Sequence, residues 1–414
     1  MADTLTLDRV RGLDADDPLK SLRSAFVLPE GLIYLDGNSL GPASEAALAG
    51  LDRAAVREWG QDLIRSWNSA GWFQLPLDLG DRVGRLIGAA PGQVAVTDST
   101  SVNIFKALSA AAGLRPGRNV ILAEGSSFPT DLYIAEGFVA SQPGLTLRLQ
   151  GEGERIEDML GPDVAVVLLN HVNYRSGRLL DMAALTRKIH QAGALTVWDL
   201  CHSAGALDVD LDGAGADFAV GCTYKYLNGG PGAPAFVYVA ERHQTEARQP
   251  LSGWWGHARP FDFATRYEGA PQIARFLCGT QPILSLRALK GALEVWEGVD
   301  MAALRRKSLA LTDLFIALVE DRCGGHGLDL QTPRDHRARG SQVSFAHPAA
   351  WPLAQALIER GVIGDFRAPD VLRFGLTPLY LRFEDVWNAV EMLREVLDSG
   401  VWQEPRFTAR HAVT

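Results

Sequence analysis

The chain has 414 residues, of which 47% are hydrophobic, and a formal net charge of −9 at pH 7. This length accommodates two or more domains with large apolar cores, and the composition is that of a globular rather than a disordered protein. Nucleic acids and anionic membranes bind clustered basic residues, so the acidic balance argues against both and favours a small-molecule partner.

The cysteines and the N-terminal residues exclude further classes. Cys201, Cys222, Cys278 and Cys323 show no metal-ligand spacing, so the sequence predicts neither a disulfide framework nor a metal site. The first residues contain no apolar run of signal-peptide length, and no segment approaches the ~20 apolar residues of a membrane span. We therefore expect a soluble, cytoplasmic protein.

Short apolar segments alternate with amphipathic ones from about Val94 to Val239, which is typical of a mostly parallel sheet covered by helices. The predicted strands are Val94–Thr97, Asn119–Ala123, Thr146–Leu149, Val164–Leu169, Leu195–Asp199, Phe218–Cys222 and Ala235–Val239. The predicted helices between them are Thr100–Ala112, Phe128–Ala140 and Met182–Ala192. Ligands of such α/β sheets bind beyond the carboxyl ends of the strands, so residues that follow these strands are site candidates.

The two ends of the chain have a different pattern. After residue 283 it predicts the helices Pro282–Gly298, Met301–Glu320 and Phe383–Ser399 and the strands Gln342–Ala346 and Val371–Leu376. We expect a large domain over residues 71–283, with residues 1–70 and 284–414 packed together as a smaller α+β domain. The last residues, Gln403–Thr414, are predicted to form a loosely held tail.

A carboxylate and a lysine follow two consecutive predicted strands. Asp199 ends the apolar run Ala194–Trp198, and Lys225 stands between Tyr224 and Tyr226 before a glycine-rich loop. Pyridoxal phosphate chemistry requires this pair, because the lysine forms a Schiff base with the cofactor and the carboxylate holds the pyridine nitrogen protonated. Taken singly, Lys225 could be a surface charge and Asp199 a helix cap, but together they favour the cofactor.

Other strand ends carry residues that would complete a cofactor pocket. Thr100 and Ser101 begin a helix whose amides and dipole favour a phosphate, although an ordinary helix cap has the same sequence. Phe128 could lie flat on the pyridine ring or belong to the core, and Asp131 could bond the cofactor or cap the next helix. His202, three residues after Asp199, could contact the cofactor or be a core histidine. Tyr224 could give its phenol to the phosphate.

Longer motifs resemble those of the kynureninase family, a fold-type-I group of pyridoxal phosphate enzymes among the class V aminotransferases. The resemblance covers nearly the whole chain in order. The narrowest motifs are Phe128-Pro-Thr-Asp131, Gly253-Trp-Trp-Gly-His257 and Cys278-Gly-Thr-Gln-Pro282. It also includes Tyr34-Leu-Asp-Gly-Asn38, Trp67-Asn-Ser-Ala-Gly71, His171-Val-Asn173 and Arg373-Phe-Gly-Leu-Thr-Pro.

The resemblance implies a role for each matching residue. Lys225 would hold the cofactor, and Asp199 would pair with its pyridinium. The phosphate would be held by Thr100, Ser101 and Tyr224. Phe128 would stack on the ring, and Asp131 and His202 would line the pocket. Trp254 and Thr280 match positions that reach the cofactor of the neighbouring subunit, which makes a homodimer the expected unit.

The resemblance also implies the substrate side and the reaction. Arg373 would grip the substrate α-carboxylate, and Asn38, Trp67 and Gly279 would lie around the substrate. The reaction would be hydrolysis of L-kynurenine to anthranilate and L-alanine in tryptophan catabolism, with Lys225 taking the α-proton and Tyr224 a candidate proton relay. Trp67 and Gly279 look like the bacterial type, which favours kynurenine over 3-hydroxykynurenine.

Two alternatives remain open from the sequence. The first is another class V activity, an aminotransferase or a cysteine desulfurase, for which Cys323 in a glycine-rich segment is the candidate nucleophile. The second is a sensor that binds pyridoxal phosphate without turnover, although the chain has no basic arm that would bind DNA.

Overall fold

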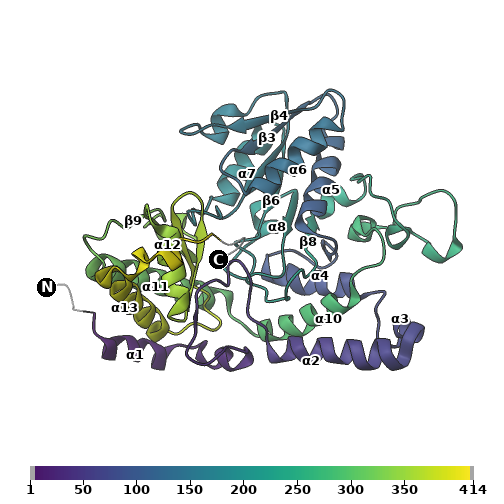
Figure 1. Cartoon of the computed structure of the whole chain (residues 1–414). Coiled ribbons are helices and arrows are strands. Elements are labelled where there is room, and N and C mark those ends of the chain that lie inside the picture. The colour runs from purple at the N-terminus through teal and green to yellow at the C-terminus, as the bar shows by residue number, and fades with distance from the viewer. Residues whose placement is uncertain (1–4, 411–414) are drawn as a thin grey trace. The chain divides into compact units, whose positions relative to one another are not determined.

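The computed structural model describes residues 5–410, which divide into two compact units (Figure 1). The larger unit comprises Ala46–Tyr174 and Leu180–Glu294, and the smaller one comprises the described residues up to Glu45, Arg175–Leu179 and the described residues from Val295 on. Residues 46–70 and 284–294, which the sequence pattern assigned to the smaller domain, cluster with the larger unit instead.

The larger unit is built on one seven-stranded sheet with the strand order β2-β8-β7-β6-β5-β3-β4. Its strands are β2 (Val94–Val96), β3 (Val120–Glu124), β4 (Thr146–Gln150), β5 (Val164–Asn170), β6 (Leu195–Asp199), β7 (Phe218–Gly221) and β8 (Phe236–Val239). Only β8 runs antiparallel to its neighbours in this sheet. The predicted fold class, a mostly parallel seven-stranded α/β sheet, is confirmed, with each strand end within two residues of its predicted place.

Three helices of this unit, α5, α6 and α7, lie in sequence between strands of the sheet, and they are labelled in Figure 1. The helices are α2 (Glu45–Arg53), α3 (Ser66–Ser69), α4 (Leu75–Leu86), α5 (Thr100–Gly113), α6 (Pro129–Ala140), α7 (Met182–Gln191), α8 (Leu211–Ala214), α9 (Glu241–Gln244) and α10 (Ile283–Ala292). Ser99 caps α5 by accepting the Val102 amide, and Asp181 caps α7 by accepting the Ala184 amide. These caps fix where two helices start and so place the residues of their first turns.

Shorter helical segments complete the larger unit. A π-helix covers Ala54–Asp62, and the 3₁₀ segments are Leu63–Arg65, Ile156–Met159, Trp254–Gly256, Pro260–Asp262, Gln272–Phe276 and Leu293–Trp296, of which the last continues into the smaller unit. The predicted helix Pro282–Gly298 therefore ends earlier, at Ala292, and tightens into the last of these 3₁₀ turns.

The core of the larger unit explains why the strands are so uniformly apolar. Every residue of β5 is buried, as is every residue of β3 and β6. Strands that are covered on both faces lose the alternation of polar and apolar residues, which is why short continuous apolar runs predicted them. On the β2 edge, a Cβ at Gly80 of α4 would lie 2.0 Å from the Val94 carbonyl oxygen, so only glycine permits this approach.

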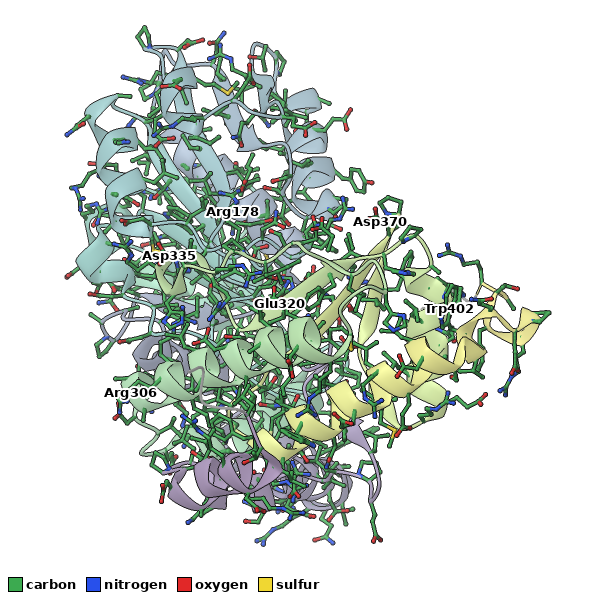
Figure 2. The ribbon with its side chains drawn as sticks, turned by 90° about the vertical axis from the view of Figure 1, so that its left-hand side faces the viewer. Arg178, Arg306, Glu320, Asp335, Asp370 and Trp402 are labelled. Atoms are coloured by element: carbon green, nitrogen blue, oxygen red, sulfur yellow. The ribbon has the colours of Figure 1, made fainter. Side chains whose placement is uncertain are left out.

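The smaller unit holds an antiparallel sheet with the order β12-β13-β10-β9 and a separate parallel pair, β1 and β11. Its strands are β1 (Ile33–Tyr34), β9 (Asp329–Leu330), β10 (Gln342–Ala346), β11 (Val362–Ile363), β12 (Asp365–Arg367) and β13 (Val371–Gly375). Its helices are α1 (Leu7–Asp16), α11 (Met301–Arg322), α12 (Ala350–Glu359) and α13 (Phe383–Ser399), with 3₁₀ segments at Lys20–Ala25, His336–Ala338, Val401–Gln403 and Pro405–Phe407. Figure 2 shows α11, which carries Arg306 and Glu320, beside α13.

The predicted loosely held tail is wrong for most of its length. Phe407 is buried, and the Trp351 indole donates a hydrogen bond to the Ala409 carbonyl at 3.0 Å. An aromatic side chain that finds an apolar surface in this way holds its segment against the unit. Residues 411–414 lie outside the described part of the chain.

No helix within residues 5–410 has both the length and the apolar composition needed to cross a bilayer.

Candidate active site

Two buried carboxylates meet at the carboxyl edge of the large sheet through one amide. Asn170, the last residue of β5, donates from Nδ2 to Asp131 Oδ2 at 2.6 Å and to Asp199 Oδ2 at 3.2 Å. Its Oδ1 accepts the backbone amide of Phe128 at 2.8 Å, while Asp199 Oδ1 accepts the amide of Cys201 at 2.6 Å. Three of the predicted cofactor residues are thus held by a single side chain.

The pair of carboxylates shares an unusual electrostatic environment. Asp131 and Asp199 are both at most 5% exposed. Burial, and then the charge of Asp199, raise the pKa of Asp131 well above its ordinary value. A carboxyl group that is buried beside another carboxylate ionises less easily, so Asp131 retains its proton at pH values where an exposed carboxyl is charged. A protonated ring nitrogen is the kind of partner that such a pair can satisfy.

Lys225 lies half-buried in the loop that follows β7. Its Nζ is 3.2 Å from His202 Nε2, and it is 5.8 Å from the ring centroids of both Phe128 and Tyr224. The following residues turn sharply, since Asn228 has φ 58° and its amide donates to the Lys225 carbonyl. The Lys225 amine is therefore close to the imidazole of His202 and to both aromatic rings.

The start of α5 faces the same sheet edge. Thr100 and Ser101 lie in its first turn, and the Thr100 hydroxyl lies 3.8 Å from Sγ of Cys201, which is two residues after Asp199 in the loop that follows β6. The preceding Asp98 has φ 50°, a left-handed conformation that a non-glycine residue adopts only when its surroundings hold it there. The free amides of this helix start and the two hydroxyls make it suitable for a phosphate group.

Tyr224 is held as a hydrogen-bond donor. Burial is the main cause that raises the pKa of its phenol, and the charge of nearby Cys222 is the next. The phenol is therefore protonated at neutral pH and can donate to an anion or pass a proton.

Trp67 and Trp254 lie in one aromatic cluster with Trp72, Phe73 and Trp255. The Trp67 ring centroid is 5.9 Å from that of Trp254 and 5.1 Å from that of Trp255, and Phe73 stacks on Trp255 at 5.5 Å. Trp254 is 37% exposed, so one edge of the cluster faces solvent in the single chain. Each of these contacts involves rings of the larger unit.

Gly279 and Thr280 are exposed in the segment that follows Phe276. A Cβ at Gly279 would meet no atom within 4 Å, so packing within the described chain does not require a glycine at this position. The small residue instead leaves open space on the surface beside Thr280.

Arg373 belongs to the smaller unit and is pre-oriented there. Its Nε donates to Asp365 Oδ1 at 2.8 Å, its Nη2 also contacts Asp365 Oδ2, and Nη2 lies 2.7 Å from Ser39 Oγ. Burial would raise the pKa of Asp365, but the charge and hydrogen bonds of Arg373 hold it below its ordinary value. The guanidinium, only 1% exposed, is thus fixed as a cation in one plane.

Asn38 lies close to this arginine's strand. It is completely buried, and both polar atoms of its side chain lack a hydrogen-bond partner among residues 5–410. A Cβ at Gly375, two residues after Arg373, would lie 2.2 Å from Asn38 Oδ1, so a glycine is needed there. Unused donors and acceptors are costly when buried, which suggests that a polar ligand completes them.

Sequence reasoning missed three residues of this arrangement. Asn170 ends a buried apolar strand, as Asp199 does, so that signal could have identified it. Ser39 adjoins the predicted Asn38. Asp365 carried no local signal, because it reaches Arg373 only through the antiparallel pairing of β12 with β13.

Pyridoxal phosphate fits the donor set of the larger unit. The set offers an accessible amine on Lys225, a buried carboxylate pair, an aromatic ring on Phe128 and a helix start with free amides. These are the four groups that an aldehyde, a pyridinium nitrogen, a flat ring and a phosphate require.

Known proteins that resemble this chain also point to pyridoxal phosphate enzymes. A family model described as the kynureninase C-terminal domain matches residues 304–393. A kynureninase of Burkholderia pseudomallei (strain 1106a) is 57% identical over 414 residues, covering 99% of this chain and 100% of the relative. A kynureninase of Pseudomonas fluorescens is 57% identical over 407 residues, covering 97% and 98% respectively.

Among solved structures, a C-DES mutant with glycine covalently linked to its PLP cofactor superimposes with a TM-score of 0.75. It covers 95% of this chain and 100% of its own at 17% identity, a level at which only the fold is shared. The full-length identity to the two bacterial relatives decides the family: the chain belongs to the kynureninases.

Proposed function

We propose that this chain hydrolyses L-kynurenine to anthranilate and L-alanine as a pyridoxal phosphate-dependent hydrolase of a carbon–carbon bond. The observation that carries the proposal is the 57% identity to proteins named kynureninase over 99% of the chain. The grouping of Lys225, His202 and the Asp131–Asn170–Asp199 cluster supports it, since these groups supply an amine and a buried anion in one place.

The larger unit would hold the cofactor. Lys225 would bind its aldehyde, Asp199 and Asp131 would bind the pyridine nitrogen, and Phe128 would stack on the ring. Thr100, Ser101 and Tyr224 would bind the phosphate, and His202 would contact the polar ring edge. When bound, pyridoxal phosphate supplies an electron sink for the charge left at the substrate α-carbon.

The chain's own groups would move the protons. Lys225 Nζ would take the α-proton once the substrate amine has replaced it, and the imidazole of His202 at 3.2 Å can hold that amine in place. Tyr224, whose phenol stays protonated because burial raises its pKa, would return a proton to the leaving part of the substrate. Asp199, held by Asn170, would stay next to the ring nitrogen throughout.

The smaller unit would bind the α-carboxylate. Arg373 is a fixed, buried cation, and the amide of Asn38 is unpaired within the described chain, so both can bond a carboxylate. Trp67 and Gly279 would shape the space for the aromatic ring and favour L-kynurenine over the 3-hydroxylated substrate. Specificity constants for the two substrates test this preference, and a larger constant for 3-hydroxykynurenine would contradict it.

We further propose a homodimer in which Trp254 and Thr280 reach the cofactor of the neighbouring subunit. Both residues are exposed in the single chain, so a second subunit could reach them, which supports this assignment.

The structure gives the rival desulfurase activity little support. Cys323 is buried, and burial, with the charge of Asp398 second, raises the pKa of its thiol to about 11. A nucleophilic cysteine needs the opposite, an accessible thiol with a lowered pKa.

The deciding experiment incubates the purified holoenzyme with L-kynurenine and follows anthranilate by its fluorescence. Wild-type protein is expected to release anthranilate, and the Lys225→Ala variant is expected to release essentially none. Equal rates for the two proteins would overturn the role of Lys225. Release of sulfide from cysteine without anthranilate from kynurenine would instead favour the desulfurase.

A further inference from the structure

Helix α5 carries a completely buried lysine that the proposed chemistry does not use. Lys106 lies two turns into the helix, and its side chain is 0% exposed. Burying an ammonium group is costly unless a charge and hydrogen bonds compensate it. The contacts of Lys106 therefore indicate its role in the structure.

The ammonium of Lys106 joins two segments that are far apart in sequence. Its Nζ lies 2.5 Å from Asp98 Oδ2 and 2.6 Å from the backbone carbonyl of Phe276. Asp98 is the residue with φ 50° that directly precedes the α5 cap. Phe276 begins the segment that carries Gly279 and Thr280.

A second contact ties the same two segments together. The hydroxyl of Thr97 lies 2.7 Å from Asp98 Oδ2 and 3.1 Å from the side-chain oxygen of Gln281, and Gln281 is buried. The side chain of Gln281 in turn donates to the Gly279 carbonyl at 3.0 Å. Hydrogen bonds around Asp98 thus connect the turn before α5 to the Phe276–Gln281 segment.

The position of Asp98 poses an electrostatic problem that Lys106 solves. The Asp98 carboxylate is 23% exposed and sits two residues before Thr100, where an incoming phosphate would find the helix amides. An unpaired carboxylate there would compete for the positive end of the helix dipole and repel a phosphate dianion. Paired with Lys106, it keeps its structural hydrogen bonds without presenting a net charge.

We propose that Lys106 is a positioning residue of the cofactor site, which neutralises Asp98 and fixes the phosphate-binding turn to the Phe276–Gln281 segment. This inference rests on the proposed function, because it takes pyridoxal phosphate as the ligand of the α5 start. Its specific consequence concerns the phosphate group alone: the ring and the aldehyde are bound by residues that Lys106 does not contact.

The test compares two ligands that differ only in the phosphate. Holoenzymes are stripped of cofactor and titrated with pyridoxal phosphate and with pyridoxal, following the Schiff-base absorbance. Lys106→Met is expected to weaken pyridoxal phosphate binding about tenfold or more and to leave pyridoxal binding unchanged, since the Asp98 carboxylate, left without its lysine, would repel the phosphate group only. The double variant Lys106→Met/Asp98→Asn is expected to recover most of the loss, because it removes the unpaired carboxylate.

The smaller unit offers a matched control. Lys307 is also a buried lysine that pairs with a carboxylate, Asp17 at 2.7 Å, and with a backbone carbonyl, Pro378 at 2.6 Å. Lys307→Met removes an equivalent buried pair, so it is expected to lower stability while leaving the affinity for both ligands unchanged.

The possible outcomes distinguish a failure of the role of Lys106 from a failure of the proposed function. If Lys106→Met weakens both ligands equally, or if the double variant gives no recovery, Lys106 is merely structural and the inference is overturned. Where Lys106→Met does not fold, Asp98→Asn replaces it and is expected to bind pyridoxal phosphate at least as tightly as wild type; a phosphate-specific loss would overturn the inference. Wild-type protein that binds neither ligand would instead refute the proposed function.

Discussion

Asn170 shows how much one side chain can determine at the scale of a residue. Its amide donates to both carboxylates of the cluster and its oxygen accepts the amide of Phe128, so it orients three of the proposed cofactor contacts at once. An amide suits this task because it donates to two anions without adding a charge of its own. A leucine of similar volume keeps the packing and removes every one of these bonds.

We therefore predict that Asn170→Leu weakens pyridoxal phosphate binding about tenfold or more, because hydrogen bonds to charged groups are lost in a buried site. Equilibrium titration with the cofactor measures this. The control is Thr186→Val, which removes the buried acceptor of the Trp198 indole in the same unit. It is expected to lower stability without changing cofactor affinity, and an equal loss of affinity in both variants would refute a specific role for Asn170.

The second prediction at this scale concerns Arg373. Its Nε and Nη2 engage both oxygens of Asp365, a fork that lysine cannot reproduce. Arg373→Lys is expected to raise KM for L-kynurenine about tenfold or more with a smaller effect on kcat, since the α-carboxylate grip is lost. Arg367→Lys is the matched control, because Arg367 contacts the same Asp365 and Ser39 from a more exposed position. Similar KM values for Arg373→Lys and wild type would contradict the proposed grip.

The sequence carries a signal for a candidate site residue where a polar residue ends an apolar strand, as Asp199 does, or precedes a glycine-rich loop, as Lys225 does. It could not predict Asp365, whose contact with Arg373 depends on strand pairing across a turn. Nor could it show that Lys106 is buried, since a lysine in a helix is usually a solvated charge. Such contacts depend on register and burial, which are tertiary properties.

At the scale of elements, the strands were predictable because parallel strands covered on both faces become continuous apolar runs. The short helical segments were not. The π-helix Ala54–Asp62 has an exposed Trp59 and a buried Glu58, a pattern that no α-helical or strand period predicts. The buried Glu58 carboxylate accepts hydrogen bonds from the Trp72 indole and from Arg287. The sequence could not reveal these two contacts.

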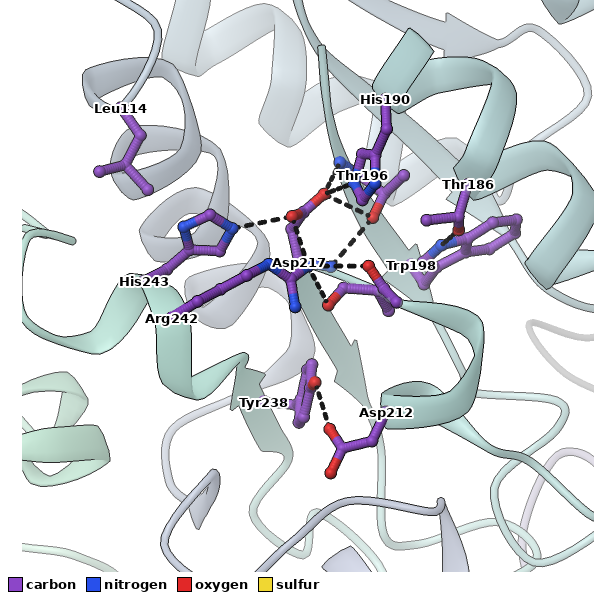
Figure 3. A network of polar contacts seen from close by, with 12 residues as sticks. Leu114, Thr186, His190, Thr196, Trp198, Asp212, Asp217, Tyr238, Arg242 and His243 are labelled. Carbon is purple, nitrogen blue, oxygen red and sulfur yellow. Dashed lines mark hydrogen bonds and ion pairs between the residues drawn. The ribbon is translucent and has the colours of Figure 1, made fainter. Parts of the chain in front are cut away.

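A polar network at the amino end of β7 ties four elements together and has a defined pH dependence (Figure 3). The Asp217 carboxylate, 1% exposed, accepts hydrogen bonds from Thr196 of β6, His190 of α7, and Arg242 and His243 of α9. Burial alone would raise the pKa of Asp217, but the bonds from His190 and His243 outweigh it, and the pKa lies well below the ordinary 3.8.

A carboxyl group with a lowered pKa stabilises the fold above its ordinary pKa, and this contribution is lost as the pH falls toward the lowered value. We predict that Asp217→Asn lowers the free energy of unfolding by about 2 kcal/mol or more at pH 7. The deficit should be equal at pH 5 and should shrink below pH 3.8. Urea unfolding at pH 7, pH 5 and pH 3 measures this difference in the free energy of unfolding.

The control for this prediction is Asp163→Asn, which removes the exposed pair of Asp163 with Arg148. Exposed pairs contribute little, so its unfolding midpoint should stay close to that of wild type at each pH. A deficit for Asp217→Asn that persists unchanged at pH 3 would show that packing, not the carboxylate charge, is what the variant loses.

At the scale of the whole molecule, a cluster of large apolar side chains stays exposed in the single chain. Phe261 and Phe263 are 66% and 85% exposed beside Trp254, and a hollow of about 370 Å³ lies against Trp254, His257, Phe263 and Tyr267. A soluble monomer rarely presents such groups together, whereas a subunit interface uses them. This surface, defined by Trp254, Phe261 and Phe263, is where the proposed second subunit would pack.

If Trp254 serves the neighbouring site, two inactive chains must be able to repair each other. In a dimer of one Lys225→Ala chain and one Trp254→Ala chain, one site combines the intact lysine of the second chain with the intact tryptophan of the first. Random assembly makes half the dimers mixed and gives each one working site of two, so we predict about a quarter of wild-type activity after equal mixing and subunit exchange. Chains carrying both substitutions, mixed with themselves, should stay inactive. Should each site be complete within one chain, mixing would add nothing beyond the average of the two parent variants, and kynurenine turnover measured before and after exchange distinguishes these two arrangements.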